Sequence, residues 1–349
     1  FVPFSPQEVT NLMEYLGSST STPMGALRAA RGHPAPWTGV FSRIHLEFGN
    51  ENWNNSAYRG AAITVPVPCG NRASELFSAI KASPYYNAAQ IQCVLGGQNG
   101  NHGLNIALHN DSSQHDAFTL APYMAYRVDN FATNEDLFGP LFAEPEWWSF
   151  NPSATSGLMR YALGQLQTSS RPVPLSVYEV NLHTTTGSIS QGALDSFTPS
   201  VGAAVAVADH MLVMLKELNS REQVFFSLAG HSYSLGDGRT ARLWGSVLDM
   251  GKTNRKRPHY HAMQMLNDVL AGDLVRTTHS GDDPTWSINN MNRVTFTNAH
   301  HLQSFAFKNG TQRGLVVFNL HRTSALDVRF TGPNAPAGTL TLRRLTSTS

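Results

Sequence analysis

The sequence is poor in charge and in cysteine. Of its 349 residues only 14% are charged, and the formal net charge is +1. No strong field of either sign therefore favours a nucleic acid or an anionic membrane surface, and we predict no nucleic-acid partner. No apolar run reaches the roughly 20 residues that cross a bilayer, so we predict no membrane span. The two cysteines, Cys69 and Cys93, could form one disulfide or remain two buried thiols.

Several motifs of known chemistry are also missing from the sequence. It has no Cys/His cluster of the kind that binds zinc, no phosphate-binding glycine loop and no serine-hydrolase motif, so we predict no metal and no cofactor. With so few charges, the surface must depend on Asn, Ser, Thr, Gln and Gly. Because this bias is common in secreted proteins, we predict a secreted, periplasmic or extracellular location.

The first 272 residues alternate between strand-like and helix-like segments. Ser5 to Glu8 form a capping box with Pro6 at the first helical position, which predicts a helix that ends at Gly17. Further helices are predicted over residues 71–82, 155–167, 199–219 and 257–270. Short apolar segments between them predict buried strands over residues 42–48, 90–95, 117–125, 174–179 and 224–228. Strands that alternate with helices indicate an α/β fold, here a (β/α)8 TIM-type barrel.

The pattern changes after Gly272. Short segments now alternate apolar and polar residues, and Asn309-Gly310 and Gly332-Pro333 mark turns between some of them. The predicted strands are 294–297, 302–307, 314–319, 326–330 and 340–345. Strands at this spacing predict an antiparallel β-sandwich. We therefore expect a partial barrel domain over residues 1–272 and a β-sandwich domain over residues 273–349.

The barrel strands are too few to close a barrel. Five are found, whereas a closed barrel of this class has eight. The chain opens with what would be the helix after the third strand, so the five correspond to strands four to eight and the first three are expected to be missing from this chain. Five open strands would leave two bare edges, which is an aggregation hazard. We expect a second copy, as a homo-oligomer, or a second chain to cover them.

Two acids each follow a barrel-type strand. Glu51 lies in Gly49-Asn50-Glu51 after the apolar residues 44–48, and Glu179 follows residues 174–178. Cleavage of a glycosidic bond requires two carboxyl groups, one to protonate the leaving oxygen and one to attack or stabilise the sugar cation. Glu51 could instead be a solvated loop acid, and Glu179 a buried acid paired with an arginine. The pairing predicts a sugar hydrolase with an oligo- or polysaccharide substrate.

At this point the sequence resembles a known family. Residues 14–51, which include Gly25 to Pro34 and Gly49-Asn50-Glu51, are similar to the clan A glycoside hydrolases and most similar to the α-L-arabinofuranosidases. Residues 257–260 (Arg-Pro-His-Tyr) and 316–320 (Val-Val-Phe-Asn-Leu) are similar too. The resemblance extends from about residue 5 to residue 345.

The resemblance implies a retaining mechanism. Glu51 matches the acid/base of the family and Glu179 matches its nucleophile. In such sites the two carboxyl groups lie about 5–5.5 Å apart, so a covalent glycosyl-enzyme forms. Glu51 is expected to keep its proton until the leaving group takes it, while Glu179 stays ionised. Asn50 matches the asparagine that binds the hydroxyl next to the anomeric carbon, and this bond should tighten in the transition state.

The sequence also departs from the family. A Trp often follows the nucleophile, but here Val180 does. Relatives often carry a His-x-Tyr pair on strand six; Pro122-Tyr123 occupies that region, and Tyr123 could hydrogen-bond the nucleophile. His231 and Tyr233 follow the last strand and are candidate substrate contacts.

Aromatic residues near the two acids are more ambiguous. Trp53 could stack on a sugar or pack over the barrel mouth. Tyr178 is interpreted as a packing residue. The adjacent pair His300-His301 is not expected to share one metal ion, since neighbours in a strand point to opposite faces.

The main prediction is a retaining exo-glycosidase for arabinofuranose-type or related sugars. A clan A hydrolase with another sugar preference, xylanase-like or glucuronidase-like, is one alternative. The other, from a different class, is a catalytically degenerate carbohydrate-binding or structural protein on a glycosidase scaffold.

Overall fold

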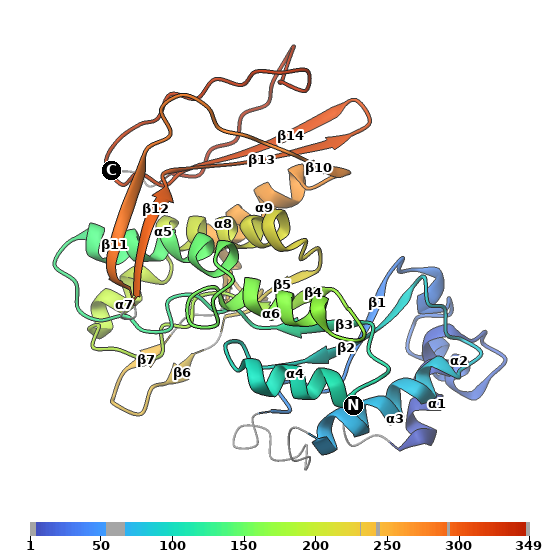
Figure 1. Ribbon diagram of the computed structural model, residues 1–349. Helices are drawn as coiled ribbons and strands as arrows, with labels where there is room; N and C mark the ends of the chain where they lie inside the picture. The colour runs from blue at the N-terminus through green and yellow to red at the C-terminus, as the bar shows by residue number, and fades with distance from the viewer. Residues whose placement is uncertain (1–4, 54–66, 231, 242–244, 292–293, 347–349) are drawn as a thin grey trace. The chain divides into compact units, whose positions relative to one another are not determined.

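The computed structural model describes residues 5–53, 67–230, 232–241, 245–291 and 294–346 (Figure 1). The chain divides into two compact units. The first comprises Phe1–Ala121 and Tyr161–Tyr178, and the second comprises Pro122–Arg160 and Glu179–Ser349. The predicted domain boundary near residue 272 follows a different criterion, the change in sequence pattern, and stays a prediction.

A parallel sheet of five strands forms the α/β part of the molecule. Its order, β1-β2-β3-β4-β5, follows the chain without reversal. An order without reversal is typical of a barrel-type sheet, whereas doubly wound sheets reverse at a switch point. Strand β4 begins in the first unit and ends in the second. The strands are β1 (Ile44–Glu47), β2 (Ile91–Gly96), β3 (Ala117–Leu120), β4 (Leu175–Val180) and β5 (Gln223–Phe225).

All five strands lie within or beside the predicted segments, so the expected α/β fold with part of a TIM-type barrel is confirmed. Strand β3 is shorter than expected and ends before Pro122, which lacks the N–H that a ladder requires. Met124 still makes an isolated parallel bridge to Leu182. The chain after β3 thus continues alongside the chain after β4.

Helices of the first unit pack on one another in chain order, α1 on α2 and α3, and α3 on α4. The capping box at Ser5 is present, with Glu8 bonding back to the Ser5 backbone N–H at 2.7 Å. The bounds are α1 (Pro6–Gly17), α2 (Pro23–Ala30), the 3-10 turn η1 (Trp37–Gly39), α3 (Val67–Lys81) and α4 (His102–Asp111). Helix α2 was missed because its segment is rich in Ser, Thr, Gly and Pro; Thr22 caps it and Pro23 starts it.

Arg28 of α2 ties this region together. Its side chain is fully buried, and its guanidinium donates to the carbonyl oxygens of Tyr15 (2.5 Å), Ser18 (2.6 Å), His33 (3.1 Å) and Pro34 (3.3 Å). A buried charge is tolerated only when its donors are satisfied in this way. Arg28 therefore joins the end of α1 to the loop after α2.

The second unit is built on long buried helices. Helix α5 packs on α8, and α8 packs on α9. A core cluster joins α8 and α9 to strand β13 (Leu302–Asn309) through Leu212, Val213, Leu266, Phe305 and Phe307. The bounds are α5 (Asn134–Phe150), α7 (Gln191–Phe197), α8 (Val201–Leu218) and α9 (Pro258–Val269), while α6 (Leu158–Thr168) crosses the division between the units.

Among the described residues no single helix is long and apolar enough to cross a bilayer. Helices α7 and α8, which meet at a bend of 57°, pass that test only as a pair and only by length and composition.

The C-terminal region contains less sheet than predicted. Strand β13 pairs with β10 (Asp273–Val275) and β14 (Gln312–Asn319), and β11 (Thr285–Met291) pairs with β12 (Val294–His300). The predicted strands at 326–330 and 340–345 are wrong, because both segments lack regular structure and Leu342 is 87% exposed. An alternating pattern becomes a strand only where a partner edge is available.

Small two-stranded ladders complete the described secondary structure. They are β6 (Tyr233–Ser234) with β7 (Thr240–Ala241), and β8 (Val247–Leu248) with β9 (Arg255–Lys256).

Cys69 and Cys93 are both free and buried, so the disulfide left open by the sequence is absent. Burial raises the pKa of Cys69 to about 11 and that of Cys93 to about 12, so neither is a reactive thiolate at neutral pH.

Candidate active site

A tight turn places Glu51 just beyond the carboxyl end of β1. Gly49 and Glu51 both have left-handed backbone angles, with φ of 70° and 47°. The Asn52 side chain closes the turn by donating to the Phe48 carbonyl at 2.5 Å. A left-handed conformation is uncommon for a residue with a side chain, and such strain is concentrated at functional sites.

Tyr178 contacts Glu51 within the first unit. Its hydroxyl donates to Oε1 of Glu51 at 3.3 Å. Tyr178 lies on β4 and Glu51 follows β1, and β2 and β3 lie between these strands in the sheet. A flat sheet would hold the two strands about 14 Å apart, at about 4.8 Å per neighbour. The contact is made because a barrel-type sheet curls and brings the ends of non-adjacent strands together.

Glu179 lies near the end of β4, in the second unit. The Tyr123 hydroxyl donates to its Oε2 at 2.7 Å. The Tyr123 ring meets Phe226, the residue after β5, edge to face at 6.5 Å. Tyr123, which follows β3, thus contacts both Glu179 near the end of β4 and Phe226 after β5. The hydrogen bond that the sequence suggested between Tyr123 and this acid is present.

The segment that carries Tyr123 is fixed from both sides by buried polar groups. His210 of α8 donates from Nε2 to the Pro122 carbonyl at 3.2 Å, and Glu144 of α5 accepts from the Ala125 N–H at 2.9 Å. Burial lowers the pKa of His210 to about 4 and raises that of Glu144 to about 7. His210 is therefore neutral at pH 7, with one ring nitrogen available as a donor.

The other predicted site residues in the described part of the chain are exposed or half-buried. Asn50 is exposed next to Glu51, and Trp53 is half-buried after the same turn. The buried indole nitrogen of Trp53 has no hydrogen-bond partner in the described part of the chain. Tyr233 is 54% exposed on β6. His231 lies outside the described residues.

Asn50, Glu51 and Trp53 thus belong to the first unit, and Tyr123, Glu179 and Tyr233 belong to the second. Their roles stay predictions.

Three residues at or near the two acids were not predicted from the sequence to belong to the site. Tyr178 was interpreted as packing, yet its hydroxyl reaches Glu51. Glu144 and His210 lie on helices that carry no motif. Tyr178 could have been found from its position beside Glu179, because parallel strand ends meet at one edge of a sheet. Nothing local marks the other two.

Comparison with known proteins gives a match in structure and none in sequence. No protein-family model matches the chain, and no curated protein sequence matches it significantly. Among solved structures, the α-L-arabinofuranosidase of Thermotoga maritima, crystallised with arabinose, superposes with a TM-score of 0.65 at 14% identity. That match covers 93% of this chain and 60% of the other.

The chain has the fold of the GH51 α-L-arabinofuranosidases.

Two further enzymes support this. The GH51 arabinofuranosidase of Xanthomonas axonopodis pv. citri gives a TM-score of 0.64 at 14% identity over 92% of this chain and 60% of that enzyme. The enzyme of Thermotoga petrophila RKU-1 gives 0.63 at 14% identity over 93% and 60%. The predicted resemblance is confirmed at the level of the fold.

The chain spans about 60% of the length of the arabinofuranosidases that it matches. An identity of 14% shows the fold alone and assigns no activity to this chain.

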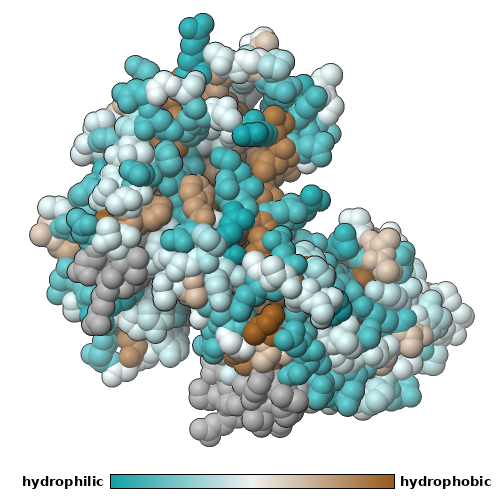
Figure 2. Space-filling model, in the orientation of Figure 1, coloured by the Kyte–Doolittle hydropathy of each residue, from teal (hydrophilic) through white to brown (hydrophobic). Residues whose placement is uncertain are grey.

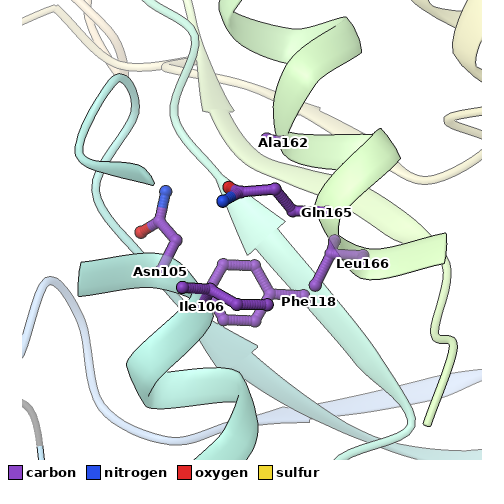
Figure 3. Close-up of a pocket in the computed structure, with 6 residues that line it drawn as sticks. All are labelled: Asn105, Ile106, Phe118, Ala162, Gln165 and Leu166. Carbon is purple, nitrogen blue, oxygen red and sulfur yellow. The ribbon is translucent and has the colours of Figure 1, made fainter. Parts of the chain in front are cut away.

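A hollow in the first unit is too small for a sugar. It lies between β3 and helices α4 and α6, and its volume of about 10 Å³ holds about one water molecule (Figure 3). Asn105 and Gln165 point toward it, and the rest of its lining is apolar: Ile106, Phe118, Ala162 and Leu166.

No group of three or more His, Cys, Asp or Glu residues in the described ranges is arranged to hold a metal ion. The His300-His301 pair is used for packing instead. His300 bonds through Nδ1 to buried Glu146 at 3.1 Å, while the His301 ring stacks on Trp286 at 4.5 Å. The two rings have separate partners, and His301 lies in the bend between β12 and β13 rather than in a strand.

A buried histidine pair lies between α4 and the loop before β4. His109 and His115 share a hydrogen bond of 2.9 Å, and the guanidinium of Arg171 lies 3.1 Å from the His115 ring. Burial and Arg171 lower the pKa of both rings, to about 2 for His115. Both rings are therefore neutral at pH 7, and this cluster is structural.

Asp283, His279 and Ser304 form a hydrogen-bond chain like that of serine hydrolases, with distances of 2.9 and 2.8 Å. Ser304 lies within β13 and is only 6% exposed. A nucleophile must reach its substrate, so we assign this chain to holding the loop after β10 against β13.

Proposed function

We propose that this protein is a retaining glycoside hydrolase that removes terminal arabinofuranose-type or related sugars from polysaccharides. The observation that carries the proposal is the pair Glu51 and Glu179, each at the carboxyl end of a parallel barrel-type strand and each hydrogen-bonded by a tyrosine. Catalytic residues of barrel enzymes lie at this end of the strands. The arabinofuranosidase fold of the chain adds support for this sugar class.

In the proposed mechanism Glu179 attacks the anomeric carbon as the C–O bond to the leaving group breaks. Glu51 gives its proton to the leaving oxygen and then, as a base, takes a proton from the water that hydrolyses the glycosyl-Glu179 ester. Tyr123 stabilises the carboxylate of Glu179 through its hydroxyl. Asn50 binds the hydroxyl beside the anomeric carbon, and Trp53 contacts the sugar.

The proposal also includes two further substrate contacts and the location of the protein. His231 and Tyr233 are proposed substrate contacts after β5. The low charge content supports a secreted or periplasmic location, and most of the surface in Figure 2 is hydrophilic or neutral in hydropathy, with apolar residues in separate patches.

A C-terminal β-sandwich is also retained as a proposal, supported by the two ladders β10-β13-β14 and β11-β12.

Strands β1 and β5 are the outer strands of the five-stranded sheet. We propose that a second copy or another chain covers them. Light scattering of the purified chain tests this, because a monomer at all concentrations contradicts coverage by a second copy.

The test of activity is a panel of 4-nitrophenyl glycosides with the native chain, Glu179→Gln and Glu51→Gln. We expect turnover of the α-L-arabinofuranoside by the native chain and none by Glu179→Gln. Glu51→Gln should lose about 10²–10⁴-fold, the usual contribution of general acid–base catalysis. Glu75→Gln, which changes an exposed acid on α3, is the control and should act like the native chain.

Because Glu51→Gln slows hydrolysis of the ester, a sugar adduct on Glu179 should accumulate and be seen by intact mass spectrometry. Release of product with inverted configuration, or full activity of Glu179→Gln, contradicts the proposed mechanism.

The alternative is a carbohydrate-binding or structural protein on a degenerate glycosidase scaffold. The sequence identity of 14% to the matched enzymes shows their fold and not their activity. Absence of turnover for every glycoside together with tight oligosaccharide binding would support this alternative over the enzyme.

A further inference from the structure

An aromatic pair, exposed Tyr126 and half-buried His183, lies close to Glu179 in the second unit. The rings of Tyr126 and His183 are 4.7 Å apart at a tilt of 39°, and the His183 ring meets Tyr123 edge to face at 6.0 Å. Tyr123 in turn donates to Glu179. His183 is therefore connected to the proposed nucleophile through Tyr123, and Tyr126 through His183 and Tyr123.

Tyr126 is accessible although its backbone is fixed. The residue is 56% exposed. Thr186 donates from its hydroxyl to the Tyr126 carbonyl at 2.6 Å, and Arg127 forms an isolated parallel bridge with Thr186. A ring on a fixed backbone loses little freedom when a ligand covers it. An exposed aromatic residue held in this way is suited to binding more than to packing.

His183 packs against the Tyr126 ring. Its Nδ1 lies 2.6 Å from the Thr185 hydroxyl, which fixes the orientation of the imidazole. Burial lowers the pKa of His183, so the ring is neutral at pH 7.

Further hydrogen bonds fix the segment 185–189, which follows His183. Arg239 of the β6–β7 hairpin donates to the carbonyls of Gly187 and Ile189 at 2.8 and 2.7 Å, and Ser188 bonds to Asp129 at 2.9 Å. The segments 126–130 and 185–189 and the hairpin thus form one hydrogen-bonded rim around the aromatic pair.

We propose that Tyr126, supported by His183, is a stacking platform for the sugar on the leaving-group side of the bond that Glu179 attacks. The C–H groups on one face of a sugar ring pack on an aromatic ring, while its hydroxyls remain in contact with water and polar neighbours. The sugar attacked by Glu179 must lie against that carboxylate, whereas His183 and Tyr123 separate Tyr126 from it. A terminal-sugar hydrolase needs a site for the next unit on this side.

The proposal rests on the proposed function, and binding measurements separate the two. In the Glu179→Gln background, titration calorimetry with arabinose and with α-1,5-linked arabinotriose compares one sugar with three. Tyr126→Ala should weaken arabinotriose binding about tenfold, the effect of losing one aromatic contact, and leave arabinose binding unchanged. Tyr126→Phe keeps the ring and should keep arabinotriose binding. Phe150→Ala, which removes an exposed ring at the end of α5, is the control.

Each result bears on the proposal. Arabinotriose binding that is unchanged in Tyr126→Ala overturns the platform even when the native chain is an active hydrolase. Equal losses for arabinose and arabinotriose also overturn it, because they indicate a general disturbance. Weaker arabinotriose binding in a chain without hydrolytic activity supports the platform and contradicts the enzyme. If the parent variant does not bind arabinotriose at all, both proposals fail.

Discussion

The hydrogen bond between Tyr123 and Glu179 gives the sharpest prediction. Tyr123→Phe removes one hydroxyl and keeps the ring that packs on Phe226 and His183. The bond is short, 2.7 Å, and ends on a carboxylate. A hydrogen bond to a charged group contributes about 1.5–3 kcal/mol, which corresponds to a loss of about 10- to 150-fold in kcat/KM.

The assay is kcat/KM for 4-nitrophenyl α-L-arabinofuranoside from pH 4 to pH 8, with thermal unfolding of each variant. Without the hydroxyl donor the ionised form of Glu179 loses stabilisation, so the acidic limb of the profile should move to higher pH. Tyr260→Phe on α9 is the control and should leave the profile unchanged.

Activity of Tyr123→Phe within threefold of the native chain, with an unmoved acidic limb, would refute the reasoning. A large fall in melting temperature would mean that the loss of activity reflects folding rather than the site.

Further predictions concern both the site and the stability of the first unit. Tyr178→Phe removes the donor to Glu51 and should move the basic limb of the pH profile to higher pH, since the protonated acid is then favoured; an unmoved limb contradicts this role. Arg28→Met leaves four carbonyl oxygens without their donor, the buried one of Ser18 among them, and should lower the free energy of unfolding by about 1–3 kcal/mol in urea titrations, whereas an unchanged free energy contradicts the assignment. His109 and His115 have lowered pKa values in the folded chain, so below pH 6.5 the unfolded state binds more protons and stability should fall as pH falls, by up to about 1.4 kcal/mol per pH unit for each ring. Urea titrations from pH 7 to pH 4 measure this slope, and a His115→Gln variant should show a smaller one.

Helix α1 and the five parallel strands were predictable because their signals are local. The capping box at Ser5 and the apolar segments that became β1 to β5 depend on residues a few positions apart. The turn at Gly49-Asn50-Glu51 was also visible, since glycine accepts the left-handed angle there.

Helix α5 was missed for a physical reason. It is buried nearly all round and contains Pro140 and Pro145, so it shows no amphipathic period and has two apparent breaks. The strands predicted at 326–330 and 340–345 were wrong for a different reason. Their alternation is real, but no described strand pairs with them.

The sequence by itself determined the five parallel strands, the two acids and the likeness to a glycosidase scaffold, because these depend on short-range patterns and on a motif. The tertiary structure alone decided that Tyr178 reaches Glu51 and that Tyr123, Phe226 and His183 gather around Glu179. Such contacts join residues up to 127 positions apart. They arise when a parallel sheet curls and brings its strand ends together, which no local pattern records.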